Sequence, residues 1–312
     1  MQIYFAPLEG ITGYIFRKAY QDIFGGIDCY YSPFVVTRDG GIMKNKERKD
    51  ILPEHNQGIH LVPQLLTNQA ENFCRAAEQM QELGYSEVNL NLGCPSGTVV
   101  SKGRGSGFLA RTEELDRFLD TIFQKCSCAI SIKTRLGVER PEEFYDLLKI
   151  YNRYPVKLLT IHPRTRMEFY KGKVHREIFE YAYGHSKNPV CYNGDILSSE
   201  DAKQLQEAFP NLEHIMIGRG FLSHPGFVGN AAKKQDVIEK SVVRTFMDRL
   251  LEDYREVMSG DIHALFKMKE LWIYLAPSFT NYEKYLKKIK KTNKLSEYQA
   301  AVAGLFANET LV

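Results

Sequence analysis

The chain has 312 residues, which is enough for one α/β barrel of about 250 residues and a second, smaller domain. Hydrophobic residues make up 44% and charged residues 25% of the sequence, and no long Pro, Gly, Ser or Gln tract interrupts them, so the composition excludes an intrinsically disordered chain. A net charge of +3 is too small to identify a nucleic-acid-binding protein from composition alone.

The amino-terminal residues and the cysteines predict the cellular compartment. Residues 1–6 carry neither a basic flank nor a long apolar run, so we expect no signal peptide and no membrane span. The six cysteines are scattered along the chain, and no pair of them has zinc-finger spacing or a clustered histidine nearby, so we expect no metal site. These features predict a cytoplasmic protein with free thiols and no membrane partner.

Short apolar, β-branched runs alternate with amphipathic stretches up to about residue 220, a pattern typical of repeated βα units around a parallel sheet. We predict eight strands, at residues 3–6, 28–34, 61–65, 87–91, 129–134, 157–162, 189–193 and 214–217. Their starts lie 25 to 42 residues apart, which leaves room for a crossover helix each time. Eight such units predict an α/β fold in the form of a closed TIM (β/α)8 barrel, rather than an open doubly wound sheet.

Beyond residue 238 the pattern becomes helical. Four helical stretches follow one another at residues 242–260, 263–279, 281–292 and 296–309. Gly260 ends the first stretch and Pro277 interrupts the second, so the helices should be short and fold back on one another. We therefore predict two domains, a barrel over residues 1–238 and a small all-helical domain over residues 239–312.

The predicted strands end in polar residues. In a barrel of this kind the site forms at the carboxyl ends of the strands. The residues found there are Glu9, Gln64, Asn91, Cys94, Lys133, Arg135, His162, Arg164, Asn193, Asp195 and Arg219. Any one of them could simply bond to the backbone, but amide, thiol, ammonium, imidazole and guanidinium groups on six strand ends together predict a chemical site.

The last two strand ends have the composition of a phosphate site. Loops after strands seven and eight commonly bind phosphate in these barrels, and residues 193–195 (Asn-Gly-Asp) and 218–220 (Gly-Arg-Gly) fit that use. Glycines allow backbone N–H groups to approach phosphate oxygens, and Arg219 would add a charged donor. The alternative is that both sequences are ordinary turns.

Lys133 and Cys94 are the most reactive candidates. Lys133 has apolar neighbours, so its ammonium would be costly to bury without an anionic or strongly polar partner, such as a reduced flavin ring. Cys94 lies in a Gly-Cys-Pro turn after strand four, where a structural core thiol is not expected.

The glycine-rich residues 103–107 have the wrong spacing for a dinucleotide loop. We expect them to form a flexible loop over the mouth of the barrel, with Arg104 available to a phosphate.

These residues resemble the tRNA-dihydrouridine synthase family. The most specific match is residues 91–95 (Asn-Leu-Gly-Cys-Pro), followed by Val99, Gly105 and Leu109. The remaining matches fall in the family's order and are residues 6–8, 10–12, 16–17, Gln64, 133–137, 162–165, 170–172, 193–195 and 218–220. The resemblance implies an oxidoreductase that reduces the C5–C6 double bond of specific uridines in tRNA.

The resemblance also implies roles for single residues. Cys94 would donate a proton, while Asn91, His162 and Arg164 would line the uracil. NADPH or NADH would serve as the transient reductant of FMN. The residues implied to hold FMN are Ala6, Pro7, Leu8, Gln64, Lys133, His162, Asn193, Gly194, Asp195, Gly218 and Arg219.

The resemblance further implies that the helical domain binds tRNA. Six lysines, together with Tyr282 and Tyr285, follow a predicted helix and the turn after it, and they are Lys284, Lys287, Lys288, Lys290, Lys291 and Lys294. Such a run could bind RNA phosphates or could be a solvated helix surface. We expect the protein to act as a monomer.

Two other functions fit parts of the same sequence. A flavin barrel of this layout could act on a free small molecule, as dihydroorotate dehydrogenases do, because a fold does not fix a function. A non-catalytic RNA-binding protein could keep the same fold, but such a protein would not need a thiol, an ammonium and an imidazole inside the barrel. The helical domain and the context of Cys94 favour the RNA-modifying enzyme.

Overall fold

A computed structural model describes residues 1–38, 43–227 and 238–312. These residues form two compact units, each of which draws on several parts of the chain. The first unit contains residues 1–7, 28–194 and 209–216. The second unit contains residues 8–27, 195–208 and the described residues from 217 onward.

The first unit is built on a parallel sheet. Its strands are β1 (Gln2–Phe5), β2 (Cys29–Tyr31), β3 (Val35–Val36), β4 (Leu61–Val62), β5 (Gln64–Leu66), β6 (Glu87–Leu92), β7 (Ala129–Arg135), β8 (Leu159–His162), β9 (Val190–Tyr192) and β10 (His214–Ile217). The strand order is β3-β5-β6-β7-β8-β9-β10-β1-β2-β4. All eight predicted strands are present, and their ends agree within a few residues.

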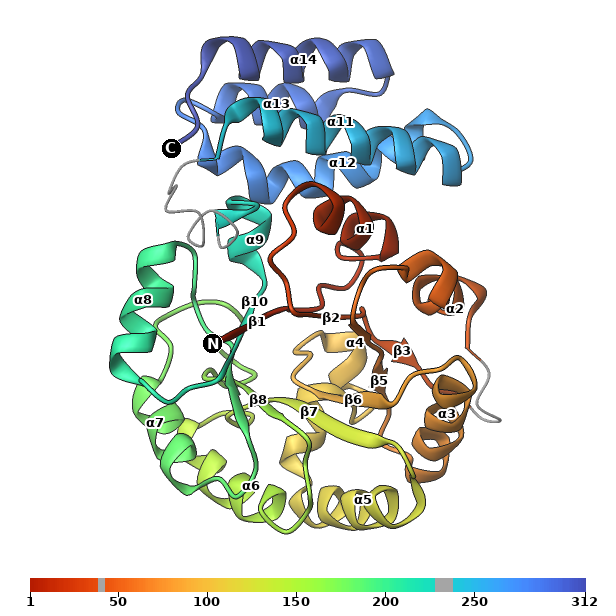
Figure 1. Ribbon diagram of the computed structural model, residues 1–312, viewed down its shortest axis with the longest axis vertical. Coiled ribbons are helices and arrows are strands. Elements are labelled where there is room, and N and C mark those ends of the chain that lie inside the picture. The colour runs from red at the N-terminus through yellow and green to blue at the C-terminus, as the bar shows by residue number, and fades with distance from the viewer. Residues whose placement is uncertain (39–42, 228–237) are drawn as a thin grey trace. The chain divides into compact units, whose positions relative to one another are not determined.

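Two of the predicted strands are interrupted in the middle. The second is divided into β2 and β3 around Pro33, and the third into β4 and β5 at Pro63. Proline has no N–H to donate to a neighbouring strand, so the ladder breaks there. The halves still pair in order, β2 with β4 and β3 with β5. The two ends of the sheet are therefore joined, and the ten segments close into the predicted eight-stranded barrel (Figure 1).

Helices of the first unit lie outside the ring of strands, as Figure 1 shows for α3, α5, α6 and α7. The helical segments of this unit are α2 (Asn45–Ile51), η2 (Pro53–Asn56), α3 (Ala70–Glu82), α4 (Gly97–Val100), η3 (Gly105–Ala110), α5 (Thr112–Lys125), η4 (Pro141–Glu143), α6 (Phe144–Tyr151) and α7 (Arg176–His185). Their apolar faces cover the outward residues of the strands, including Val88, Leu90 and Leu92 of β6, which are fully buried.

The interior of the barrel is part apolar and part polar. Eight buried residues form an apolar cluster and are Tyr4, Ala6, Cys29, Tyr31, Val62, Leu158, Cys191 and Met216. A chain of side-chain amides crosses three adjacent strands elsewhere in the barrel. Gln64 Nε2 donates to Asn89 Oδ1 at 2.8 Å, and Asn89 Nδ2 donates to Ser131 Oγ at 2.9 Å. These residues are buried and face one another in register.

The second unit is all-helical in its described residues. Its segments are α1 (Tyr14–Ile23), α8 (Ser199–Ala208), α9 (Arg219–Ser223), α11 (Lys240–Val257), α12 (Asp261–Leu275), η5 (Ala276–Ser278), α13 (Glu283–Lys291) and α14 (Leu295–Asn308). The four predicted carboxyl-terminal helices are confirmed, with Gly260 and Pro277 at the predicted breaks. Ser198 caps α8, because its Oγ accepts the N–H of Asp201 at 3.1 Å. None of the described helices is long and apolar enough to span a membrane.

The helical unit has its own core. Trp272 is fully buried and donates from Nε1 to the Tyr298 hydroxyl at 2.8 Å. Helix α1 packs against α11, where Phe16 and Tyr20 contact the edge of Phe246. The grouping therefore includes an early helix, α1, as well as the carboxyl-terminal ones. The functional division into a catalytic domain (1–238) and a tRNA-binding domain (239–312) remains a prediction.

Candidate active site

The turn that carries Cys94 is held from both sides. Asn91, at the end of β6, accepts the N–H groups of Gly93 and Cys94 on its Oδ1 at 3.0 and 2.9 Å. Its Nδ2 donates to Gln64 Oε1 at 2.7 Å. Asn91 therefore fixes the backbone of the cysteine turn, and the amide chain of the barrel interior fixes Asn91.

The carbonyl side of Cys94 is held by the start of η3. Ser106 donates to the Cys94 carbonyl through its N–H at 3.1 Å and its Oγ at 2.8 Å. Gly105 has a φ of +56°, and a Cβ at this position would lie 2.8 Å from the Cys94 carbonyl oxygen. Only glycine accommodates both constraints at low cost. The prediction of a flexible loop over residues 103–107 is wrong for residues 105–107, which begin the 3-10 helix η3 with Gly105 and Ser106 buried. Arg104 contacts Asn68 at 3.5 Å.

Lys133 lies beside this turn, on β7. It is the register partner of Asn91 on β6, and its Nζ donates to Asn193 Oδ1 at 2.6 Å. In residues 1–38, 43–227 and 238–312 the structure records no carboxylate at ion-pair distance from Lys133. Burial, with a smaller contribution from the charge of Arg135, lowers the pKa of Lys133 to about 7. An anion bound beside Lys133 would restore its charge.

The lowered pKa of Lys133 predicts how the stability of the protein without bound flavin depends on pH. Lys133 binds a proton below about pH 7 when folded but below its ordinary 10.5 when unfolded, so the unfolded state holds more protons between these values. The free energy of unfolding should rise with pH across this window. The full shift corresponds to roughly 5 kcal/mol. In Lys133→Met this rise should be absent, and near pH 7 the variant should have a free energy of unfolding higher by a few kcal/mol. The loss of the hydrogen bond to Asn193 should reduce this gain by about 1–3 kcal/mol.

Urea unfolding at pH 7 and pH 9.5 measures this difference. Lys149→Met is the matched control, because Lys149 is an exposed lysine of α6 in the same unit. Parallel pH dependences in the wild type and Lys133→Met would show that Lys133 keeps an ordinary pKa in the folded protein.

Arg135, at the end of β7, joins the cysteine turn to the loop after β8. Its Nε donates to the Gly93 carbonyl at 2.8 Å, and its Nη1 donates to the carbonyls of Thr165 and Phe169 at 2.9 and 2.7 Å. The guanidinium is 1% exposed and lies 5.3 Å from the centre of the Tyr170 ring. The sequence predicted no separate role for Arg135, although an arginine at the carboxyl end of a barrel strand is a signal for a buried donor.

His162 and Arg164 begin the same loop. Both are buried, and Arg164 Nη1 lies 3.3 Å from His162 Nε2. Arg164 also donates to the carbonyls of Lys171 and Gly172 at 3.1 and 2.6 Å. Arg164 therefore fixes the far end of the loop and orients His162, and this geometry gives it a positioning role in addition to the predicted contact with uracil.

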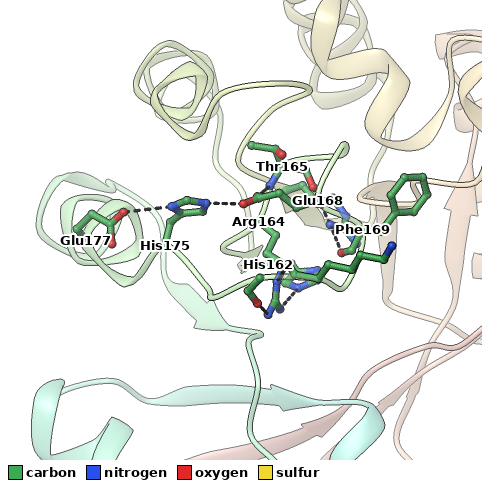
Figure 2. Close-up of polar contacts among 10 residues, drawn as sticks. His162, Arg164, Thr165, Glu168, Phe169, His175 and Glu177 are labelled. Carbon is green, nitrogen blue, oxygen red and sulfur yellow. Dashed lines mark hydrogen bonds and ion pairs between the residues drawn. The ribbon is translucent and has the colours of Figure 1, made fainter.

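Farther along, the loop is closed by a histidine between two carboxylates (Figure 2). His175 contacts Glu168 at 2.7 Å and Glu177 at 3.3 Å, and Glu168 accepts the Thr165 N–H at 2.6 Å. Although burial opposes it, bonding to the two carboxylates raises the pKa of His175. Residues 163–175 are thus tied down by Arg135, Arg164 and His175.

The predicted phosphate residues are divided between the two units. Asn193 and Gly194 belong to the first, where a Cβ on Gly194 would meet the Tyr192 ring. Asp195, Gly218 and Arg219 belong to the second, where Arg219 Nη2 pairs with Asp195 Oδ1 at 2.6 Å. In the same unit Gly220 packs so closely on the Ile196 carbonyl that a Cβ would lie 2.2 Å away. The second unit therefore brings together the loops that begin at Asp195 and Gly218.

The other predicted flavin residues lie at the start of the chain and on β5. Ala6 and Gln64 are buried in the first unit, which also contains Pro7. Leu8 is the first residue of the second unit, and its N–H donates to Thr12 Oγ1 at 2.9 Å. The assignment of these residues to FMN remains a prediction.

Comparison with known proteins gives one consistent family. The profile of the dihydrouridine synthase family matches residues 4–310. A probable tRNA-dihydrouridine synthase of Helicobacter pylori is 29% identical over 309 residues, which cover 95% of this chain and 90% of that protein. The tRNA-dihydrouridine synthase B of Pasteurella multocida is 27% identical over 225 residues, covering 72% of this chain and 67% of that protein.

Solved structures resemble the fold at low sequence identity. An old yellow enzyme homologue from Zymomonas mobilis superposes with a TM-score of 0.54 at 12% identity, covering 78% of this chain and 92% of that one. A morphinone reductase variant in complex with tetrahydroNAD gives a TM-score of 0.54 at 10% identity, covering 77% and 89%. At these identities the likeness shows the fold alone.

Proposed function

Because this chain belongs to the dihydrouridine synthase family, we propose that it reduces the C5–C6 double bond of specific uridines in tRNA, with FMN as cofactor and NADPH or NADH as transient reductant. The observation that best supports this function is the fixed Cys94 turn after β6 beside the half-buried ammonium of Lys133 on β7. An acid and a cation at the carboxyl ends of neighbouring barrel strands suit the reduction of a flat, electron-poor ring.

The residues of the first unit fit a flavin. Lys133 has an amide but no carboxylate beside it in the described residues, so the barrel leaves its charge uncompensated. The electron-rich edge of a flavin ring would compensate that charge. We infer that the residues that hold FMN are Ala6, Pro7, Leu8, Gln64, Lys133, His162, Asn193, Gly194, Asp195, Gly218 and Arg219.

The protein side of the reaction is a proton transfer from Cys94. FMN supplies, when bound and reduced, the hydride that is added to C6 of the uracil. The Cys94 thiol donates its proton to C5, so Cys94 must be protonated when the base arrives. The turn held by Asn91 and Ser106 keeps the Cys94 backbone in place, which reduces the loss of freedom in the transition state.

We infer that His162 and Arg164 bind the uracil from the loop after β8. Asn91 supports the site by holding the cysteine turn, because its side-chain amide already bonds to Gln64 and to two backbone N–H groups. A uridine stacked in folded RNA must be turned out to reach such a site, at a cost of about a few kcal/mol. Contacts with the rest of the tRNA must offset this cost.

The helical unit offers a basic surface for those contacts. Lys287, Lys290 and Lys291 are exposed and line one surface groove with Tyr282. Lys284 is instead paired with Glu309 at 3.0 Å. Tyr285 is buried, with Lys284 and Lys288 over its ring, so Tyr285 is not available to stack on a base. We propose that the three groove lysines contact tRNA phosphates.

Changing Lys287, Lys290 and Lys291 together to alanine should weaken tRNA binding and reduce its salt dependence. Each lost phosphate contact removes about 0.7–0.9 from the slope of log K against log salt, so the slope should fall by about two. The matched control replaces Lys125, Lys149 and Lys203, which are exposed lysines of other helices. Equal slopes in the wild type and the groove variant would assign this helix to the solvated surface.

The proposed function is tested with purified protein loaded with FMN, NADPH and tRNA that lacks dihydrouridine. Mass spectrometry of the digested tRNA should show uridines heavier by two hydrogens, in an amount that depends on all three components. Turnover of dihydroorotate or free uridine without any change in tRNA would support the small-molecule enzyme instead. A protein that binds tRNA but no flavin would support the non-catalytic alternative. From the proposed tRNA substrate we infer that the protein acts in the cytoplasm, and we expect it to act as a monomer.

A further inference from the structure

The loop between β8 and α7 presents an unusual aromatic residue. Phe169 has a φ of +54°, a left-handed backbone conformation that a bulky residue adopts only at a cost. It is one of two non-glycine residues with positive φ in the described part of the chain. A residue held in such a conformation is a candidate for a functional role when the surrounding structure enforces it.

The structure enforces the conformation of Phe169 from several sides. The Phe169 carbonyl accepts a bond from buried Arg135 at 2.7 Å, and its N–H donates to the Arg166 carbonyl at 3.2 Å. The preceding residue, Glu168, is bound to His175. The backbone of Phe169 is therefore fixed, although its side chain is not part of the network that fixes it (Figure 2).

The ring of Phe169 is left in solvent. The residue is 46% exposed, and its neighbour Met167 is 54% exposed. Among the ring contacts found in the described residues, none involves Phe169, whereas Tyr170 contacts both Arg135 and His162. An exposed phenyl ring on a tightly held loop offers a preformed flat surface to a partner, because little freedom remains to be lost on binding.

The charge of the loop indicates the kind of partner. Residues 163–177 contain five basic residues, Arg164, Arg166, Lys171, Lys173 and Arg176, but only two acidic ones, Glu168 and Glu177. Both acids contact His175, while Lys171 and Lys173 are exposed. An aromatic ring on a loop with the exposed ammonium groups of Lys171 and Lys173 suits single-stranded RNA, whose bases stack on rings and whose phosphates attract ammonium groups.

The place of Phe169 in the barrel indicates which bases it can reach. The guanidinium that holds the Phe169 carbonyl also holds the carbonyl of Gly93, the residue before Cys94. The loop thus lies beside the cysteine turn within the same unit. A base that stacks on Phe169 would be a near neighbour of the base that reaches Cys94.

We propose that Phe169 is a stacking platform for an unpaired base that flanks the target uridine. This inference rests on the proposed function and deepens it by naming a residue that binds the RNA outside the reacting base. The platform would hold the RNA strand open while the neighbouring uridine lies in the site. Its contribution would appear in the affinity for RNA and not in the chemical step.

The test uses substitutions that remove the ring without adding strain. Glycine and asparagine both tolerate positive φ, so Phe169→Gly and Phe169→Asn should keep or raise the melting temperature. Both variants should raise the KM for tRNA roughly tenfold or more, as expected for one lost base stack, with kcat at saturating tRNA within about twofold. Phe169→Trp should keep the wild-type KM. Val257→Ala should keep it as well, because it removes an exposed apolar side chain on α11, away from this loop in the chain.

Direct binding of the same tRNA separates this inference from the proposed function. The ring makes no phosphate contact, so Phe169→Gly should bind more weakly with an unchanged salt slope. An unchanged KM and affinity in Phe169→Gly, in a protein that does form dihydrouridine, would overturn the inference. An equal loss in Phe169→Trp would overturn it as well. If the wild type forms no dihydrouridine, the proposed function fails, and the binding comparison still decides whether Phe169 contacts RNA.

Discussion

Replacing Cys94 by alanine is expected to reduce the rate of dihydrouridine formation in tRNA by about 100- to 10,000-fold, the usual contribution of a positioned acid. The proton that C5 requires would then have to come from water. Binding of FMN and of tRNA should remain near the wild-type level, because alanine keeps the backbone N–H and carbonyl of residue 94, which Asn91 and Ser106 hold in place. The measurement is the rate of a single turnover with pre-reduced enzyme.

Cys126→Ala is the matched control for this prediction. Cys126 has a similar partial exposure and lies in the same unit, where its sulfur is 3.4 Å from that of Cys74. Its removal should leave the rate unchanged. A Cys94→Ala variant with the wild-type rate would show that another group supplies the proton.

Replacing Arg135 by methionine is expected to lower the free energy of unfolding by about 3 kcal/mol or more. The substitution leaves the carbonyls of Gly93, Thr165 and Phe169 without their buried donor, and an unsatisfied buried group costs about 1–3 kcal/mol. Activity should fall further than stability alone explains, because the cysteine turn and the loop after β8 lose their common anchor. Urea unfolding and kcat at a temperature where the variant remains folded measure the two effects.

Arg153→Met provides the comparison for a surface arginine. Arg153 is 56% exposed and pairs with Asp116, so its loss should cost about 1 kcal/mol or less. Arg135→Lys should also lose activity, since one ammonium cannot reach three carbonyls in the fixed geometry of a guanidinium. An Arg135→Met variant as stable as Arg153→Met would mean that water satisfies those carbonyls.

The strands and the barrel could be predicted because period and spacing carry that information. Eight apolar runs with crossover distances between them allow few arrangements. The divided second and third strands were also encoded, at Pro33 and Pro63, but their pairing across the break depends on neighbours that a linear pattern does not show.

The site could be predicted only in part. Because the end of a strand tells which edge of the sheet a residue lies at, the sequence could place Asn91, Cys94, Lys133 and His162 at or just after the carboxyl ends of their strands. Their bonding partners come from loops far along the chain, as when Arg135 reaches the carbonyl of Phe169. Exposure depends in the same way on packing, and for this reason Tyr285 was expected beside surface lysines but is buried.

The amide chain across β5, β6 and β7 has a consequence for how the barrel assembles. Gln64, Asn89 and Ser131 face one another at directly paired positions. Side chains alternate between the two faces of a strand, so a shift of β6 by one residue would turn Asn89 toward the helices and bring Val88 or Leu90 inward. A barrel with this misalignment would bury polar side chains among apolar ones without hydrogen-bond partners. Folding intermediates with the wrong alignment should therefore be short-lived. The same side chains that support the Cys94 turn therefore also favour the correct alignment of the strands when the barrel closes.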